Sequence, residues 1–102
     1  IAAFANAVAE SGQEVRLLVR DPANEARARA LVSGLVRLER REYGDIWLRD
    51  TGPLIRADGT AVRCRLNGWG GKYLMPGDEK IGAELARDAG LPTEEPDWIL
   101  EG

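Results

Sequence analysis

The sequence has 102 residues and a net charge of −3, with 44% hydrophobic and 30% charged residues. This length allows at most one small domain, and the composition excludes a largely disordered chain. The negative charge argues against a nucleic-acid partner, and no apolar run approaches the roughly 20 residues of a membrane span. No secretory leader is recognisable and a single Cys cannot form an internal disulfide, so we expect a cytoplasmic protein with no membrane partner.

The chain opens on an Ala-rich helical pattern. Over residues 1–11, Ile1, Phe4 and Val8 share one stripe. Gly12 follows at the position of a helix terminator. The pattern therefore predicts one amphipathic helix.

A strand, a helix and a second strand are expected next. The apolar run within residues 14–20 predicts a short buried strand. The Asp-Pro pair at 21–22 is typical of a helix start, and the helical pattern runs to about Ser33 before Gly34. Residues 36–39 alternate apolar and charged side chains, which predicts a half-buried strand.

The second half of the chain is less regular. Residues 43–52 fit neither period and predict an ordered loop, the usual place for binding residues. The Asp-Gly pair at 58–59 lies between two apolar runs and predicts a hairpin with a type I′ turn. After an irregular stretch at 67–76, a helix is expected over 78–90 and a strand over 97–100. A hairpin that interrupts alternating helices and strands predicts a mixed α/β unit.

Two residues of the first irregular stretch could bind a planar cation. The Asp50 carboxylate can accept two parallel hydrogen bonds from a guanidinium, or it can cap a turn. Trp47 lies three residues earlier and can form a flat wall for the cation, or belong to the core. We interpret Arg49 as structural, because a cation between Asp45 and Asp50 would hold both carboxylates ionised.

The second irregular stretch has the sequence Trp-Gly-Gly-Lys-Tyr from Trp69 to Tyr73. Gly70 and Gly71 allow a tight backbone or close approach to a ligand. A turn after the hairpin with no binding role explains these two glycines equally well. The spacing of a P-loop is missing. We therefore take Trp69, Gly70 and Gly71 as a candidate pocket loop.

The sequence argues against Cys64 as a catalytic nucleophile. Alternation in the predicted strand puts Val62, Cys64 and Leu66 on one apolar face, and the sequence contains no His to act as a base. A small buried side chain explains Cys64. With one Cys and no His, a zinc site is likewise unsupported.

Three motifs together resemble the agmatine deiminase family, which also contains bacterial-type peptidylarginine deiminases. They are DIWLRDTGP at 45–53, NGWGGKY at 67–73 and LEG at 100–102, in the family order. The resemblance implies the pentein fold, a five-fold α/β propeller built from mixed sheet modules. Residues 1–102 would then form a single incomplete domain, about the first third of a deiminase-like catalytic domain.

The resemblance also implies a reaction. A Cys thiolate attacks the guanidinium carbon, ammonia leaves, and a His activates the water that releases a ureido product, without metal or organic cofactor. Asp50 matches the carboxylate that grips the guanidinium, and Trp47 matches the Trp that packs over the substrate. Glu101 matches the Glu that supports the catalytic His. The Trp69 loop matches a family loop near the pocket.

The sequence departs from the family pattern because it lacks the family's reactive side chains. The family's His, the Asp after it and the nucleophilic Cys would lie beyond Glu101, and Cys64 does not match the nucleophile. We therefore expect these residues alone to be inactive. From the resemblance we expect the intact parent protein to act on agmatine, giving N-carbamoylputrescine for polyamine and putrescine formation. Peptidyl-arginine and a non-catalytic cation-binding or assembly module are the alternatives. Apolar residues 98–100 suggest an uncovered edge, so we expect the isolated segment to aggregate or to depend on a partner copy, as in a homo-oligomer.

Overall fold

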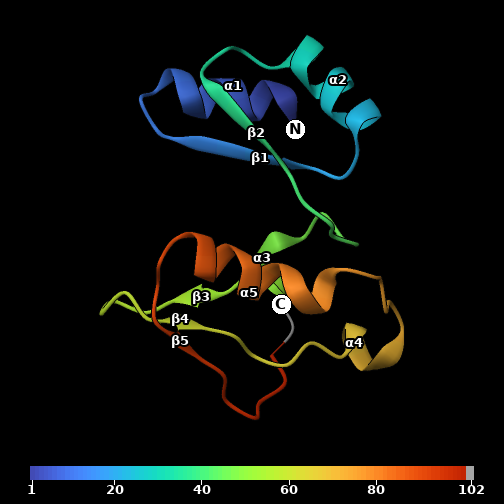
Figure 1. Cartoon of the computed structure of the whole chain (residues 1–102), viewed down its shortest axis with the longest axis vertical. Helices are drawn as coiled ribbons and strands as arrows, with labels where there is room; N and C mark the ends of the chain where they lie inside the picture. The colour runs from blue at the N-terminus through green and yellow to red at the C-terminus, as the bar shows by residue number, and fades with distance from the viewer. Residues whose placement is uncertain (101–102) are drawn as a thin grey trace. The chain divides into compact units, whose positions relative to one another are not determined.

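The computed structural model describes residues 1–100, and its chain divides into two compact units (Figure 1). Unit 1 is Ile1–Glu42, and unit 2 begins at Tyr43. The two units are described separately below. No helix within residues 1–100 has the length and apolar character needed to cross a membrane.

Unit 1 is a two-stranded parallel sheet with two helices, and it matches the expected order of elements. Strand β1 (Val15–Val19) pairs in parallel with β2 (Val36–Arg40), with Val15 opposite Val36. A parallel pair needs a crossover connection, and helix α2 (Pro22–Leu31) supplies it. Helix α1 (Ala2–Glu10) precedes β1 (Figure 1).

The core of unit 1 differs from the apolar stripe expected on α1. Ala5 and Ala9 face the core and pack with Val36, whereas Ile1 and Phe4 are exposed. Small side chains let the helix approach the sheet closely, so the alanine face is the one buried. The helix is present as expected, but the side of it that carries Ile1 and Phe4 is not the side that packs on the sheet of unit 1.

The ends of α2 show one confirmed and one corrected expectation. The Asp21 carboxylate caps the helix by accepting the Asn24 backbone N–H at 2.7 Å, with Pro22 at the first position. The helix ends at Leu31 rather than Ser33. Asn6 of α1 binds this end: its amide donates to the Leu31 carbonyl at 3.2 Å and accepts the Ser33 N–H at 2.8 Å. A tertiary contact therefore ends the helix.

Unit 2 is a three-stranded mixed sheet with one long helix, so the mixed α/β class is confirmed. Strand β4 (Ala61–Val62) lies between β3 (Leu54–Ile55), which is antiparallel to it, and β5 (Thr93–Glu94), which is parallel. Helix α5 (Asp78–Asp88) connects β4 to β5 and buries Ile81 and Ala86. A one-turn helix, α3 (Leu48–Thr51), and a tight turn with positive φ angles, labelled α4 (Gly68–Gly71), complete the unit (Figure 1).

The β3–β4 hairpin is confirmed, but its turn is not type I′. Gly59 has a φ of +86°, whereas Asp58 does not have a positive φ. The Gly59 N–H binds the Arg56 carbonyl, and the Arg56 N–H binds the Thr60 carbonyl. This is a three-residue loop with a left-handed glycine, a common hairpin closure that also tolerates Asp-Gly. The dipeptide alone does not distinguish the two turns.

The last strand lies earlier than expected. Strand β5 is Thr93–Glu94, and within 97–100 the pairing is a single bridge between Ile99 and Arg65. The Arg63 N–H binds the Glu94 carbonyl and the Arg65 N–H binds the Trp98 carbonyl. Residues 95–97 therefore bulge opposite the single residue Cys64. Pro96 lies within this bulge and has no N–H to donate.

Candidate functional site

The stretch expected as an irregular loop contains one turn of helix, α3, which carries Asp50. The Trp47 carbonyl accepts the N–H groups of Asp50 at 2.9 Å and Thr51 at 3.2 Å, which closes the turn. Thr51 is buried at 7% exposure. Four residues are too few for a stable isolated helix, so contacts with the rest of unit 2 hold this turn.

Helix α5 provides one of those contacts. A Cβ added to Gly82 would lie 2.8 Å from the Thr51 carbonyl oxygen, so the backbone of α3 rests directly on this glycine. Any larger residue would separate the two helices. The absence of a side chain at position 82 therefore sets where Asp50 sits relative to α5.

The Gly-rich stretch folds into α4, which has an unusual backbone. The Asn67 side chain accepts the Gly70 N–H at 2.8 Å, and Trp69 has a left-handed backbone with φ 53° and ψ 58°. A bulky residue rarely adopts this conformation, and such strain clusters at functional sites. The rings of Trp69 and Tyr73 meet edge to face at 6.2 Å, and the Lys72 ammonium lies 5.4 Å from the Tyr73 ring centre.

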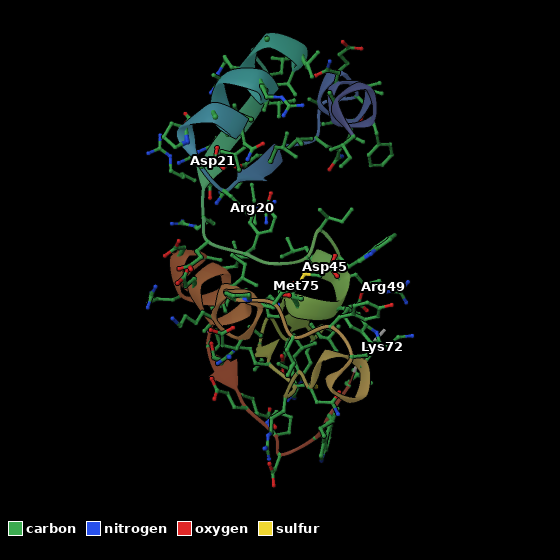
Figure 2. All side chains as sticks on the ribbon, turned by 90° about the vertical axis from the view of Figure 1, so that its right-hand side faces the viewer. Arg20, Asp21, Asp45, Arg49, Lys72 and Met75 are labelled. Carbon is green, nitrogen blue, oxygen red and sulfur yellow. The ribbon has the colours of Figure 1, made fainter. Side chains whose placement is uncertain are left out.

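The two irregular stretches line one open groove of about 740 Å³ in unit 2. Figure 2 shows Asp45, Arg49, Lys72 and Met75 gathered on the same side of this unit. The groove combines carboxylates, aromatic rings and two cations. Its lining residues are Asp45, Trp47, Arg49, Asp50, Trp69, Lys72, Tyr73 and Met75.

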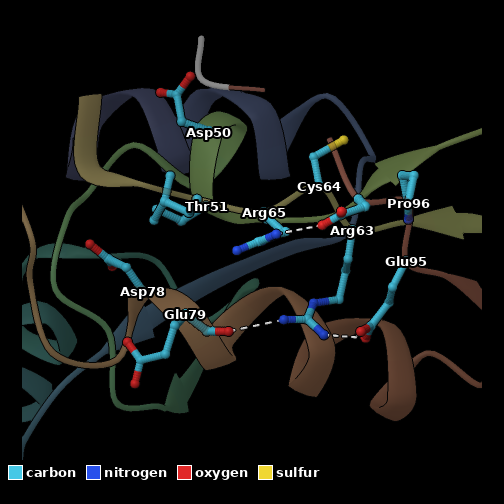
Figure 3. A pocket seen from close by; sticks show the side chains of 12 residues that line it. Asp50, Thr51, Arg63, Cys64, Arg65, Asp78, Glu79, Glu95 and Pro96 are labelled. Atoms are coloured by element: carbon cyan, nitrogen blue, oxygen red, sulfur yellow. Dashed lines mark hydrogen bonds and ion pairs between the residues drawn. The ribbon is translucent and has the colours of Figure 1, made fainter. Parts of the chain in front are cut away.

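Asp50 is half-buried in this groove. No partner within residues 1–100 forms a hydrogen bond or ion pair with its carboxylate. In Figure 3 the carboxylate points away from the ion pairs of Arg63 and Arg65. The expected ion pairs of Arg49 with Asp45 and Asp50 are not formed within the described part of the chain. Arg49 instead lies exposed, since solvation of a guanidinium competes well with a surface ion pair.

Trp47 is 61% exposed and so does not belong to the core. Its backbone N–H donates to the Asp45 carboxylate at 3.2 Å, so Asp45 stabilises this turn. A large aromatic face left open beside a carboxylate can stack on a planar cation. The structure thus places Trp47, Asp50 and Trp69, three of the residues chosen from the sequence, in one groove.

Other candidates are placed differently. Gly70 and Gly71 shape the backbone but do not line the groove. Glu101 lies outside the described residues, although Leu100 lines a smaller hollow of about 220 Å³ together with Asp50 and Cys64.

The expectation of a buried strand position for Cys64 was wrong. The thiol is free and half-buried, because β4 ends at Val62 where the opposite segment begins to bulge. Among residues 1–100, no group of three or more His, Cys, Asp or Glu side chains is placed to hold a metal ion.

Four residues at or beside the groove were not among the candidates chosen from the sequence. Lys72, Tyr73 and Met75 line the groove, and the first two belong to the quoted NGWGGKY motif, which could have indicated them. Asp78 is the fourth: its carboxylate accepts the N–H groups of Gly44 and Asp45. No local sequence signal relates this helix-start residue to a loop more than thirty positions earlier.

Comparison with known proteins identifies the family. The model of the Porphyromonas-type peptidyl-arginine deiminase family matches residues 1–102. The chain belongs to this family. A Streptomyces coelicolor protein with the provisional name agmatine deiminase is 34% identical over 91 residues, which cover 83% of this chain and 27% of that protein.

Solved structures agree with this family assignment at the level of the fold. A Cys-to-Ser variant of C. jejuni agmatine deiminase with substrate bound matches with a TM-score of 0.78 at 23% identity, over 99% of this chain and 31% of that one. The agmatine deiminase of Enterococcus faecalis matches with a TM-score of 0.79 at 18% identity, over 97% and 30%. The chain thus spans less than a third of the length of the family relatives it matches.

Proposed function

We propose that the protein containing this chain hydrolyses a guanidinium group to a ureido group with release of ammonia. The observation that carries this proposal is the groove in which Trp47, Asp50 and Trp69 meet, with an Asp50 carboxylate that has no partner among residues 1–100. Membership of a family whose model is described as a peptidyl-arginine deiminase supports it.

In this proposal Asp50 and Trp47 bind the reacting group. Asp50 accepts two parallel hydrogen bonds from the guanidinium, which fix its orientation and its charge. Trp47 covers one face of the planar cation. These contacts hold the guanidinium carbon in place for attack, and positioning of this kind lowers the barrier by making the encounter intramolecular.

The covalent steps need groups that this chain does not supply, since its sequence contains no His. A thiolate adds to the guanidinium carbon, and ammonia leaves with a proton from the enzyme. Water then cleaves the carbon–sulfur bond and restores the thiol. We propose that the nucleophile and base come from another part of a pentein propeller, and that Glu101 supports the base.

Agmatine is the proposed substrate, and N-carbamoylputrescine and ammonia are its products. Asp45 provides a second carboxylate in the groove, and the rings of Trp69 and Tyr73 suit the ammonium end of agmatine. Peptidyl-arginine is the second candidate, because the groove is open and Trp47 and Tyr73 are exposed, which leaves room for a peptide.

The test is ammonia release by the full-length protein from agmatine, free arginine and an arginyl peptide. Asp50→Asn should lower kcat/KM for the preferred substrate by about 10- to 100-fold, because charge-assisted hydrogen bonds contribute roughly 1.5–3 kcal/mol. Asp58→Asn makes the same change in the hairpin turn and should leave activity intact. Wild-type turnover by Asp50→Asn would refute the binding role, and agmatine binding without ammonia release would favour a non-catalytic module.

A further inference from the structure

We propose that Asp78 is a positioning residue that holds the Trp47–Asp50 turn in its binding geometry. The expected effect on catalysis rests on the proposed function, whereas the contact between Asp78 and the loop does not. Asp78 stands at the first position of α5 and does not line the groove of Trp47 and Trp69. It therefore acts through the loop and not on a substrate.

The first argument is the burial of the Asp78 carboxylate. Its exposure is 4%, and within residues 1–100 the buried polar or charged residues are Asp78 and Thr51. Burying an ionised carboxylate is costly unless hydrogen bonds compensate. Its side-chain partners in the described chain are backbone N–H groups, those of Gly44 at 2.8 Å and Asp45 at 2.9 Å.

The second argument is a continuous series of hydrogen bonds from Asp78 to Asp50. Asp78 accepts the Asp45 N–H, and the Asp45 carboxylate accepts the Trp47 N–H at 3.2 Å. The Trp47 carbonyl in turn accepts the Asp50 N–H at 2.9 Å. Each bond fixes the next residue, so the orientation of Asp50 depends on the buried carboxylate.

The third argument is close packing around the same contact. A Cβ added to Gly44 would lie 2.2 Å from Met75 Cβ and 2.9 Å from Asp78 Oδ2, so the loop fits against α5 only without a side chain there. One turn further along α5, the Thr51 carbonyl packs directly against Gly82, which has no side chain to block it. Figure 3 shows Thr51 and Asp78 on the same side of this region, below Asp50. The turn is thus held to α5 before and after Asp50.

Replacing Asp78 leaves a specific defect. Both N–H groups bind the same oxygen of Asp78, Oδ1, and the Asp45 N–H also binds Oδ2 at 3.2 Å. In Asn an amide nitrogen replaces Oδ2, so it faces the Asp45 N–H as a second donor and the negative charge that strengthens both bonds is lost. The buried contact is then weakened, and the loop gains an alternative to the bound geometry. We expect Trp47 and Asp50 to move away from the guanidinium while the rest of α5 stays folded.

The experiment compares the full-length wild type with Asp78→Asn, and with Glu79→Gln as the control. Glu79 is exposed, is the next residue of the same helix turn and bonds Gly77 rather than the loop, so the control removes the same charge. Amide hydrogen exchange at Gly44, Asp45 and Trp47 should accelerate about tenfold or more in Asp78→Asn. The control should stay within about twofold.

Kinetics with agmatine separate positioning from simple loss of folded enzyme. Fewer folded molecules lower the apparent kcat at unchanged KM, whereas a displaced Asp50 also weakens binding. We expect kcat/KM to fall about tenfold or more, with a raised KM. On an Asp50→Asn background the same change should add less than about twofold, because the two residues act in series.

Two outcomes would overturn the proposal: unchanged exchange at Gly44 and Asp45, or accelerated exchange with an unchanged KM. If Asp78→Asn does not fold, Gly44→Ala perturbs the same contact with the carboxylate retained and should give the same exchange and KM changes. A wild type that releases no ammonia from any guanidine refutes the proposed function. The exchange data still decide whether Asp78 holds the turn.

Discussion

The contact between α3 and α5 allows a quantitative prediction for Gly82→Ala. A helical Gly normally costs about 1 kcal/mol relative to Ala, so helix propensity alone predicts stabilisation by that amount. The new Cβ would lie 2.8 Å from the Thr51 carbonyl oxygen and 3.5 Å from Gly52 C and Pro53 N. These neighbours are backbone atoms, which cannot move away as the end of a flexible side chain can.

The steric term should exceed the propensity term. Inserting a methyl group into a well-packed contact typically costs about 1–3 kcal/mol. The net change for Gly82→Ala is therefore a loss of up to about 2 kcal/mol, opposite in sign to the propensity expectation. Because α3 carries Asp50, the same displacement should lower kcat/KM for a guanidine substrate.

Urea denaturation of the full-length protein, followed by circular dichroism, measures the change in stability. Ala83→Gly in the same helix calibrates the propensity term and should lose about 1 kcal/mol. A higher urea midpoint for Gly82→Ala, at an unchanged slope, would show that the two helices have room for a methyl group. The account of how Asp50 is held would then be wrong.

Two further predictions concern the ion pairs and the acid sensitivity of the fold. Arg63 is 23% exposed, binds the Glu79 carbonyl as well as Glu95 and is therefore expected to matter more than Arg65, which is 67% exposed. Arg63→Ala should lower the urea midpoint measurably and Arg65→Ala by little, and equal effects would refute this ranking. The Asn24 backbone N–H lowers the pKa of Asp21 below its ordinary value of 3.8. The contribution of Asp21 to α2 is then fully present above that value and is lost as pH falls through the folded-state pKa. Asp21→Asn should reduce this acid-dependent loss of stability, and an unchanged pH profile of wild type and variant would contradict it.

Local rules in the sequence account for much of unit 1. The Asp21 cap and the proline after it start α2 where expected, because both effects act within one turn. Strands β1 and β2 follow from short runs of apolar and alternating residues. The helix end at Leu31 was placed two residues too late because Asn6, far away in sequence, provides the cap.

The candidate site was predictable in its residues but not in its construction. Trp47, Asp50 and Trp69 stood out by type and spacing, and they line one groove. The helical turn that carries Asp50 was missed, because four residues form a helix only when tertiary contacts offset the cost of nucleation.

By itself the sequence determined which groups these 102 residues can offer: a carboxylate and indole rings, which we propose bind a planar cation, and no His. The tertiary structure alone decided how that carboxylate is presented. Asp78 and Gly82 hold the Asp50 turn through a buried hydrogen-bonded carboxylate and a backbone contact. Both depend on atoms that only the folded chain brings within bonding distance, so no local pattern encodes them.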